Sequence, residues 1–141
     1  MSRPLPDDAD HAEIAQVVAT FFATFVSGPG CLEGADRLRA VCLPGAVIVT
    51  AGRPPVVDSL ESFLAPRLAL LTEGRLQDFT EWPEDGRTDV HGDVAQWFGG
   101  YGKRGLLDGA PYAGRGAKSI QLVRTGEGWR ISAVAWTDDP A

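Results

Sequence analysis

Apolar side chains recur at helical spacing in three segments of the first half of the chain. The first segment begins at Asp10, with Glu13 three residues on as in a capping box, and ends at the turn residues 27–30. Its apolar face is made of Ile14, Val17, Val18, Phe21, Phe22 and Phe25. A shorter helix is expected over residues 35–41 and a third over residues 58–74, which Pro66 is expected to kink or break.

The rest of the pattern is typical of β-strands separated by turns. A β-branched run at residues 46–50 predicts one strand, and five more are expected near residues 76–82, 88–90, 94–101, 118–125 and 129–136. The break at residues 83–86 is expected to bulge or bend the sheet. Tight turns are expected at residues 91–93 and 126–128. The glycine-rich residues 102–115 are expected to form a long flexible connection.

The order of these elements predicts an α+β fold in which helices cover one face of an antiparallel sheet. The 141 residues match the size of a single domain. We therefore expect one domain over residues 1–141, with flexible ends at 1–9 and 139–141.

Charge and hydropathy narrow the possible partners. The net charge is -6, and no stretch of the chain concentrates Lys and Arg as phosphate contacts require. The apolar run at residues 14–26 is shorter than the roughly 20 residues of a membrane span. The N-terminal residues lack the pattern of a secretory signal. Nucleic acid and membrane are therefore not expected as partners, and a cytoplasmic location is the default.

Candidate metal ligands and cofactor motifs are few. Cys31, interpreted as a loop residue, and Cys42, interpreted as buried packing, are expected to be free thiols. His11 is expected at a helix start and His91 in a turn. The glycines between residues 99 and 116 match neither a dinucleotide fingerprint nor a phosphate loop. We therefore expect no metal site and no cofactor.

The last three predicted strands carry a family resemblance. Their sequences, GDVAQWFGGY, SIQLVR and GWRISAVAW, resemble those of uncharacterised bacterial members of the nuclear-transport-factor-2-like superfamily. This superfamily also contains ketosteroid isomerase, SnoaL-like polyketide cyclases, limonene epoxide hydrolase and scytalone dehydratase. The resemblance covers the chain from His11 to Asp138. It implies a cone-shaped, curved antiparallel sheet packed against three N-terminal helices, with room for a small molecule between them.

Fold alone does not assign a reaction, so acid–base candidates are judged by residue. Ketosteroid isomerase chemistry needs a Tyr and a protonated Asp as an oxyanion hole, and the first helix has Phe where that Tyr would be wanted. Glu81 is the candidate buried acid, because it lies in a strand centre beside Phe79 and Trp82. Arg87 and Asp89 share one strand face and could activate water, but their place near a turn fits solvated charges better.

Aromatic residues give the main indication of a ligand pocket, because ligand sites are mostly apolar with few polar groups. The candidate lining residues are Phe79, Trp82, Trp97, Tyr101 and Trp136. Filling of the core or of a subunit interface explains each of them equally well. Tyr112 and Arg115, in the glycine-rich connection, are candidate lid residues, with simple surface exposure as the alternative.

The alternation of the last two strands suggests how the sheet is covered. If the turn pairs them simply, Ile120, Leu122, Ile131 and Ala133 share one face, and Gln121, Val123, Ser132, Val134 and Trp136 share the other. The second face would be semi-apolar, which favours a homodimer through the outer sheet face.

Three functions stay open: a small-molecule-binding domain, a cofactor-independent enzyme with a buried carboxylate, and a dimerisation module without ligand.

Overall fold

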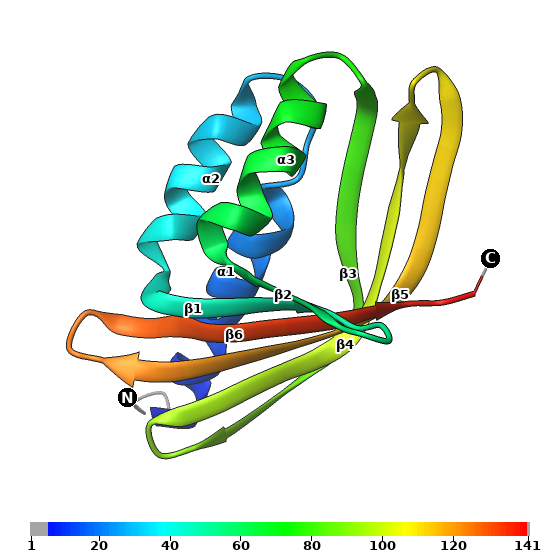
Figure 1. The fold of residues 1–141 in the computed structure, drawn as a ribbon. Helices are drawn as coiled ribbons and strands as arrows, with labels where there is room; N and C mark the ends of the chain where they lie inside the picture. Colours follow the sequence, from blue (N-terminus) through cyan, green and yellow to red (C-terminus); the bar gives the residue numbers. More distant parts are fainter. Residues whose placement is uncertain (1–5, 141) are drawn as a thin grey trace.

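The computed structural model describes residues 6–140 and has three helices on one side of a strongly bent sheet (Figure 1). Helix α1 spans Pro6–Ala23, α2 spans Gly30–Ala40 and α3 spans Leu60–Thr72. The apolar stripe that the sequence predicts is buried from Ile14 in α1 to Phe25, just beyond its end. It packs against the sheet, which confirms the layer arrangement.

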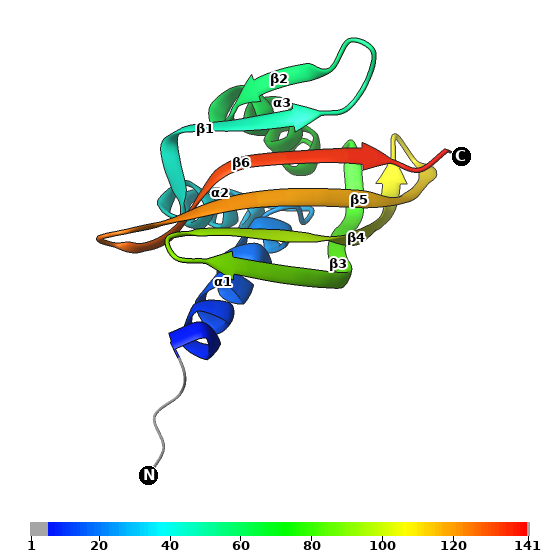
Figure 2. The same cartoon turned by 90° about the horizontal axis from the view of Figure 1, so that it is seen from below.

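The sheet has six strands in the order β2-β1-β6-β5-β4-β3 (Figure 2). Their bounds are β1 Cys42–Thr50, β2 Val56–Ser59, β3 Leu76–His91, β4 Val94–Leu107, β5 Ala110–Thr125 and β6 Gly128–Asp138. Strands β1 and β6 run parallel, and every other neighbouring pair is antiparallel. The α+β fold with three helices on a curved sheet is therefore confirmed, with one parallel pair that the sequence did not predict.

Two irregularities bend β3 toward the helices. The pairing of β3 with β4 shifts between Gln77 and Thr80 and again between Glu84 and Arg87, and the residues Asp78 and Asp85 have positive φ angles at these points. Such bulges increase the local twist of a strand. The expected break at residues 83–86 is thus a bulge within one long strand, and it helps the sheet to enclose space beside α3.

The residues expected to form a flexible connection, 102–115, instead belong to a hairpin. Strands β4 and β5 are paired from end to end, from Val94 opposite Val123 to Leu107 opposite Ala110. Asp108 and Gly109 form the turn, both at positive φ, as the favoured two-residue hairpin turns require. The glycines are therefore strand residues, and the prediction of a loop is wrong.

Several boundaries also differ from the prediction. Helix α1 already begins at Pro6, so Asp10 lies inside it, and residues 6–9 are helical; residues 1–5 and 141 lie outside the described part. Helix α2 begins at Gly30, which buries Cys31 inside it, whereas Cys42 is half-buried. Strand β2 was not expected, and Ser59, not Asp58, caps α3 by accepting a hydrogen bond from the Ser62 amide. Helix α3 continues through Pro66.

The predicted facing of the last strands is wrong beyond residue 131. The register of β5 and β6 shifts between Gln121 and Leu122, so that Gln121 lies opposite Ala133 and Leu122 opposite Ile131. Ser132 is the extra residue, and a one-residue shift moves every following side chain to the other face. Val134 and Trp136 are consequently buried on the helix side.

An ion-pair cluster ties α1 to the end of the sheet. The Arg124 guanidinium donates two hydrogen bonds to the Asp10 carboxylate, at 2.6 and 2.8 Å, and a third to Asp93. Trp129 also donates to Asp10 from its indole nitrogen. The Arg124 hydrogen bonds, with that of Trp129, lower the pKa of Asp10 to about 2.

No helix among residues 6–140 is long and apolar enough to cross a membrane.

Candidate functional site

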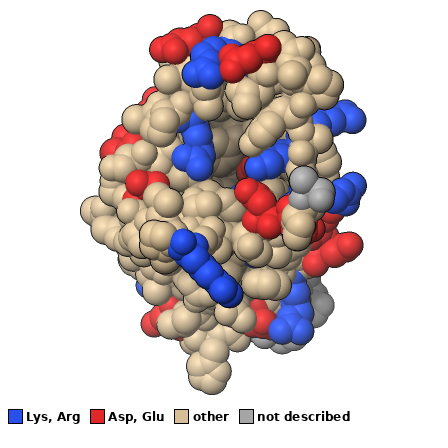
Figure 3. Space-filling view, turned by 45° about the vertical axis from the view of Figure 1, so that its right-hand side comes forward, with Lys and Arg blue, Asp and Glu red and all other residues tan. Residues whose placement is uncertain are grey.

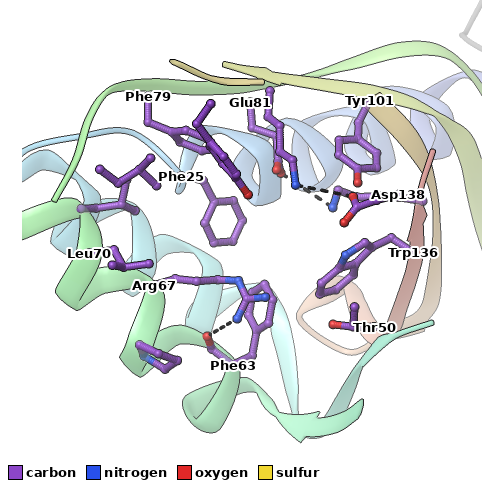
Figure 4. A pocket seen from close by; sticks show the side chains of 16 residues that line it. Phe25, Thr50, Phe63, Arg67, Leu70, Phe79, Glu81, Tyr101, Trp136 and Asp138 are labelled. Carbon is purple, nitrogen blue, oxygen red and sulfur yellow. Dashed lines mark hydrogen bonds and ion pairs between the residues drawn. The ribbon is translucent and has the colours of Figure 1, made fainter. Parts of the chain in front are cut away.

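A cavity of about 360 Å³ lies between α3 and the bent sheet (Figure 4). This volume falls in the range of small-molecule pockets, which starts at about 300 Å³. Most of the wall is apolar and includes Phe25 just after α1, Phe63 and Leu70 from α3, Phe79 from β3 and Trp136 from β6. The bends in β3 and the hairpin of β4 and β5 extend the wall beyond the helices, which is why the cavity lies at this end of the sheet.

Lys118, on β5, is a buried cation of this pocket. Its ammonium nitrogen lies 4.0 Å from the ring centre of Tyr101 and 4.3 Å from that of Trp136. Its side chain is 4% exposed, and Nζ lies 3.8 Å from Oε2 of Glu81. The pKa of Lys118 is lowered to about 8, mainly by burial and also by the positive charges of Lys103 and Arg67, while Glu81 opposes the shift.

Glu81, on β3, is the buried acid of the pocket, and its side chain is 10% exposed. Burial raises the pKa of its carboxyl, and the nearby cations, Lys118 first, only partly counter this effect. Glu81 and Lys118 thus form a pair in which burial disfavours the charged form of both partners.

Tyr101, on β4, brings a hydroxyl group that has no hydrogen-bond partner among residues 6–140. The residue is 1% exposed, and Figure 4 shows its hydroxyl pointing toward Asp138 and Trp136 inside the pocket. A Cβ at Gly116 would lie 2.7 Å from the Tyr101 ring, so glycine at this position of β5 lets the ring occupy its place. Buried polar groups nearly always have partners, so this hydroxyl is available to a ligand.

Arg67, on α3, presents a guanidinium group to the pocket without a carboxylate partner. It donates a hydrogen bond to the Phe63 carbonyl oxygen, and its guanidinium carbon lies 3.8 Å from the Phe63 ring centre. None of the ion pairs in the described part of the chain involves Arg67. Arginine stays charged and binds carboxylates with two hydrogen bonds, so Arg67 is suited to an anionic group.

The pocket opens toward a second, shallower hollow of about 770 Å³. Lys103 and Tyr112 line both the pocket and the outer hollow, and Lys103 pairs with Asp138 at 3.5 Å. The outer hollow is lined in addition by Trp82, Arg104 and Arg115, among others. Figure 3 shows the opening on this face, with basic side chains on both sides of it and acidic ones close by.

The structure brings together five of the predicted site residues and separates the others. Glu81, Phe79, Tyr101, Trp136 and Tyr112 all line the pocket. The remaining five residues are placed elsewhere, as described next.

Trp82 and Arg115 line only the outer hollow, where both hydrogen-bond to Glu84. Trp97 is not a pocket residue, because its ring packs against Phe22 of α1 in the core.

Arg87 and Asp89 do not line the pocket either. They form an exposed ion pair of 3.2 Å with each other, as expected for solvated charges near a turn, and do not reach the pocket as the water-activating pair that was the alternative. Tyr112 lies in a paired strand and is therefore a wall residue and not part of a mobile lid.

Sequence reasoning missed the cations of the site, Arg67, Lys103 and Lys118. One signal for Lys118 was present, because it has the same strand parity as the buried residues Ile120 and Leu122. A lysine at that position of the alternation indicates a charge directed toward the helices. Among residues 6–140, no three His, Cys, Asp or Glu side chains converge as metal ligands.

Comparison with known proteins supports the fold. No protein-family model matches the chain, and no curated protein gives a significant match. The Kfla4162 protein from Kribbella flavida superimposes with a TM-score of 0.75 and 21% identity, over 95% of this chain and 93% of the other. An NTF2-like protein with a cystatin-like fold from Novosphingobium aromaticivorans gives a TM-score of 0.68 and 18% identity, over 92% and 82%.

A third solved structure is similar over nearly the full length of both chains. It is an NTF2-like superfamily protein from Salmonella enterica, with a TM-score of 0.73, 13% identity, and coverage of 96% and 94%. At these sequence identities, the similarity shows a common fold but does not indicate a common activity. The expected fold is thereby confirmed, because the chain has the cystatin-like fold of these NTF2-like structures.

Proposed function

We propose that this chain binds a small, mainly apolar molecule that carries one anionic group, such as a carboxylate. The observation that carries the proposal is the pocket of about 360 Å³ in which the Arg67 guanidinium has no carboxylate partner. The apolar wall would bury the body of the ligand, and Arg67 would fix the anionic end. The unpartnered Tyr101 hydroxyl offers one further hydrogen bond.

Charge balance supports an anionic ligand over a cationic one. Three cations line the pocket, Arg67, Lys103 and Lys118, against the two acids Glu81 and Asp138. The two acids lie within 3.8 Å and 3.5 Å of the two lysines, so both are already matched. An anion would therefore meet a free positive charge at Arg67, whereas a cation would find no unmatched acid in this wall.

The test is a panel of ring-containing carboxylates, benzoate, cinnamate, 1-naphthoate and adamantane-1-carboxylate, each compared with its neutral carboxamide. Binding is measured by isothermal titration calorimetry on the wild type, Arg67→Met and a matched surface variant, Arg87→Met. We expect at least one carboxylate to bind, and Arg67→Met to weaken it about tenfold, the effect of losing a charged hydrogen bond of about 1.4 kcal/mol or more. The Arg87→Met variant should bind like the wild type.

Two results would contradict the proposal. One is that no carboxylate of the panel binds with a dissociation constant below about 1 mM. The other is that Arg67→Met and Arg87→Met bind equally well, which would place the ligand elsewhere.

A second candidate function, acid–base catalysis without a cofactor, is favoured by the burial of Glu81. A carboxyl group with a raised pKa inside a pocket is suited to taking a proton from a carbon acid and returning it. This keeps open the alternative of an isomerase, cyclase, dehydratase or epoxide-hydrolase type of enzyme. Its substrate would have to place an acidic C–H bond against Glu81.

Hydrogen–deuterium exchange at the α-carbon of 2-indanone, followed by NMR, tests this second function. The wild type should exceed the buffer rate, Glu81→Gln should lose about 100-fold of the enzymatic rate, and the exposed control Glu127→Gln should lose none. Exchange that is equally fast with Glu81→Gln would exclude Glu81 as the base.

We also propose that two copies pair through the outer face of the sheet. The strand register aligns Val57, Val49, Ala135, Ser119 and Phe98 in one row across five strands. Val57 and Phe98 are 63% and 58% exposed. An apolar row of this kind on a sheet face supports an isologous contact with a second copy.

Sedimentation velocity tests the pairing. Phe98→Glu is expected to shift a dimer to a monomer, and Leu32→Glu, at an exposed position of α2, is expected to leave it unchanged. A wild type that is monomeric at all concentrations, or a Phe98→Glu variant that is still dimeric, would contradict the proposed pairing.

The free state of Cys31 and Cys42 supports our further proposal of a reducing, cytoplasmic location.

A further inference from the structure

Lysine is confined to the pocket in this chain. Of the 13 Lys and Arg residues, only Lys103 and Lys118 are lysines. Both line the same pocket. Arginine supplies positive charge elsewhere along the chain, but only lysine has an amine that can lose its proton and attack an electrophile. The placement of both lysines in the pocket therefore suggests a chemical role for an amine there.

The surroundings of Lys118 suit a nucleophilic amine. Its nitrogen lies against the faces of Tyr101 and Trp136, in the apolar part of the wall. Glu81 lies 3.8 Å from it, within reach of a proton transfer once the side chains adjust to a ligand. Lys103 differs, because its side chain is more exposed, at 16%, and faces Asp138 at the boundary of the outer hollow.

We propose that Lys118 forms an imine with an aldehyde or ketone ligand held in the pocket. This inference rests on the proposed binding function, and it adds a covalent step and a chemical class of ligand. The lone pair of the neutral Lys118 amine attacks the carbonyl carbon and forms a C–N bond, while the C=O electron pair moves to oxygen, which takes a proton. The resulting carbinolamine loses that oxygen as water, and the nitrogen gives up its proton, so that amine and carbonyl yield imine and one water.

Two neighbouring groups have the positions that these proton movements require. The Glu81 carboxylate can accept a proton from the attacking nitrogen and, as the carboxylic acid, return it to the departing oxygen. The Tyr101 hydroxyl, which has no partner among the described residues, can donate a hydrogen bond to the carbonyl oxygen as negative charge develops there. The buried amine, acid and hydroxyl therefore complete the set of groups that the reaction uses.

Electrostatics favour the neutral amine that the attack needs. The charged groups that line the pocket with Lys118 are Glu81 on β3, Lys103 on β4, Arg67 on α3 and Asp138 on β6. With its pKa lowered to about 8 by burial, Lys118 is about half neutral at pH 8. An ordinary lysine, with a pKa near 10.4, would be less than about 1% neutral at that pH. A desolvated lysine beside other cations is one of the known ways of activating an amine.

The experiment is reductive trapping with 4-formylbenzoate and sodium cyanoborohydride at pH 8, followed by peptide mapping. Reduction of the imine adds the mass of the probe less one oxygen atom. We expect Lys118 to be labelled at least about tenfold faster than Lys103, because of its neutral fraction and its place beside the bound probe. Unfolding in urea should equalise the two lysines, and the α-amino group is separated in the peptide map.

The control variants are Lys118→Arg, which keeps a positive charge but cannot form an imine, and Lys103→Met. Binding of 4-(hydroxymethyl)benzoate, which lacks a carbonyl, is measured on each protein by calorimetry. Loss of the label in Lys118→Arg, with Lys118 still labelled in Lys103→Met, would support the inference.

Two outcomes overturn the inference and separate it from the binding proposal. Equal labelling of Lys103 and Lys118 in the folded protein, or labelling of the α-amino group alone, while 4-(hydroxymethyl)benzoate binds, removes the imine and leaves the binding function standing. Absence of the label together with absence of any binding of 4-(hydroxymethyl)benzoate counts against both the imine inference and the binding proposal. The deuterium exchange described above adds a separate readout, since exchange through an imine is lost in Lys118→Arg, whereas exchange by Glu81 alone is not.

Discussion

Removing the buried hydroxyl of Tyr101 is expected to make the protein more stable. The residue is 1% exposed, and the hydroxyl has no hydrogen-bond partner among residues 6–140. A buried polar group without a partner costs about 1–3 kcal/mol. Tyr101→Phe keeps the ring against Lys118 and removes this cost, so we expect the free energy of unfolding to rise by about 1 kcal/mol. For a chain of this length, that corresponds to a Tm increase of about 3 °C.

Urea unfolding followed by tryptophan fluorescence measures the effect, with Tyr112→Phe as the matched control. Tyr112 is half-buried, and loss of its hydroxyl is expected to change stability by less than about 0.5 kcal/mol. If Tyr101→Phe is less stable than the wild type by about 1 kcal/mol, the hydroxyl is engaged in a stabilising hydrogen bond and the reasoning is refuted. A stabilised variant that also binds the panel carboxylates more weakly would show that the hydroxyl serves the ligand at the expense of the fold.

Two further predictions concern the fold itself. Because Arg124 lowers the pKa of Asp10 to about 2, below its ordinary value of 3.8, the pair stabilises the protein above pH 4, and this stability is lost as the pH falls toward 2. Asp10→Asn should therefore have a lower urea midpoint at pH 7, with a gap to the wild type that narrows between pH 4 and 2; a constant gap would contradict the assignment. A Cβ at Gly86 would lie 2.2 Å from the Trp97 indole, so Gly86→Ala is expected to cost about 2–3 kcal/mol of stability, and Gly126→Ala, where no atom lies within 4 Å, less than about 0.5 kcal/mol. Equal stabilities of these two variants would show that the ring moves aside easily.

The sequence predicts the fold well where the pattern of apolar residues is local and regular. The stripe from Ile14 to Phe25 needs no tertiary information, because one face of a helix must be buried. The order of helices before strands then selects a helix layer on one sheet face, as the structure confirms. The glycine-rich residues 102–115 were misjudged because the Asp108-Gly109 turn signal between the two strands was overlooked.

The site is predicted less well, because it depends on long-range geometry. The extra residue Ser132 turns Trp136 toward the helices, and nothing in the local alternation of β6 indicates that shift. Arg67 interrupts an apolar helical stripe and has the sequence pattern of a solvated charge. Only the bend of β3 over α3 makes it a pocket residue. The burial of Glu81 was expected from its place beside Phe79 and Trp82 in a strand centre, whereas its role as a catalytic acid stays a prediction.

A crystal structure of the chain with the tightest-binding carboxylate of the panel tests the binding proposal most directly. The proposal predicts that the ring of the ligand lies among Phe63, Phe79 and Trp136, with its carboxylate within hydrogen-bond distance of Arg67. Ligand density confined to the outer hollow beside Trp82 and Arg104, or a pocket closed by its own side chains, would contradict it.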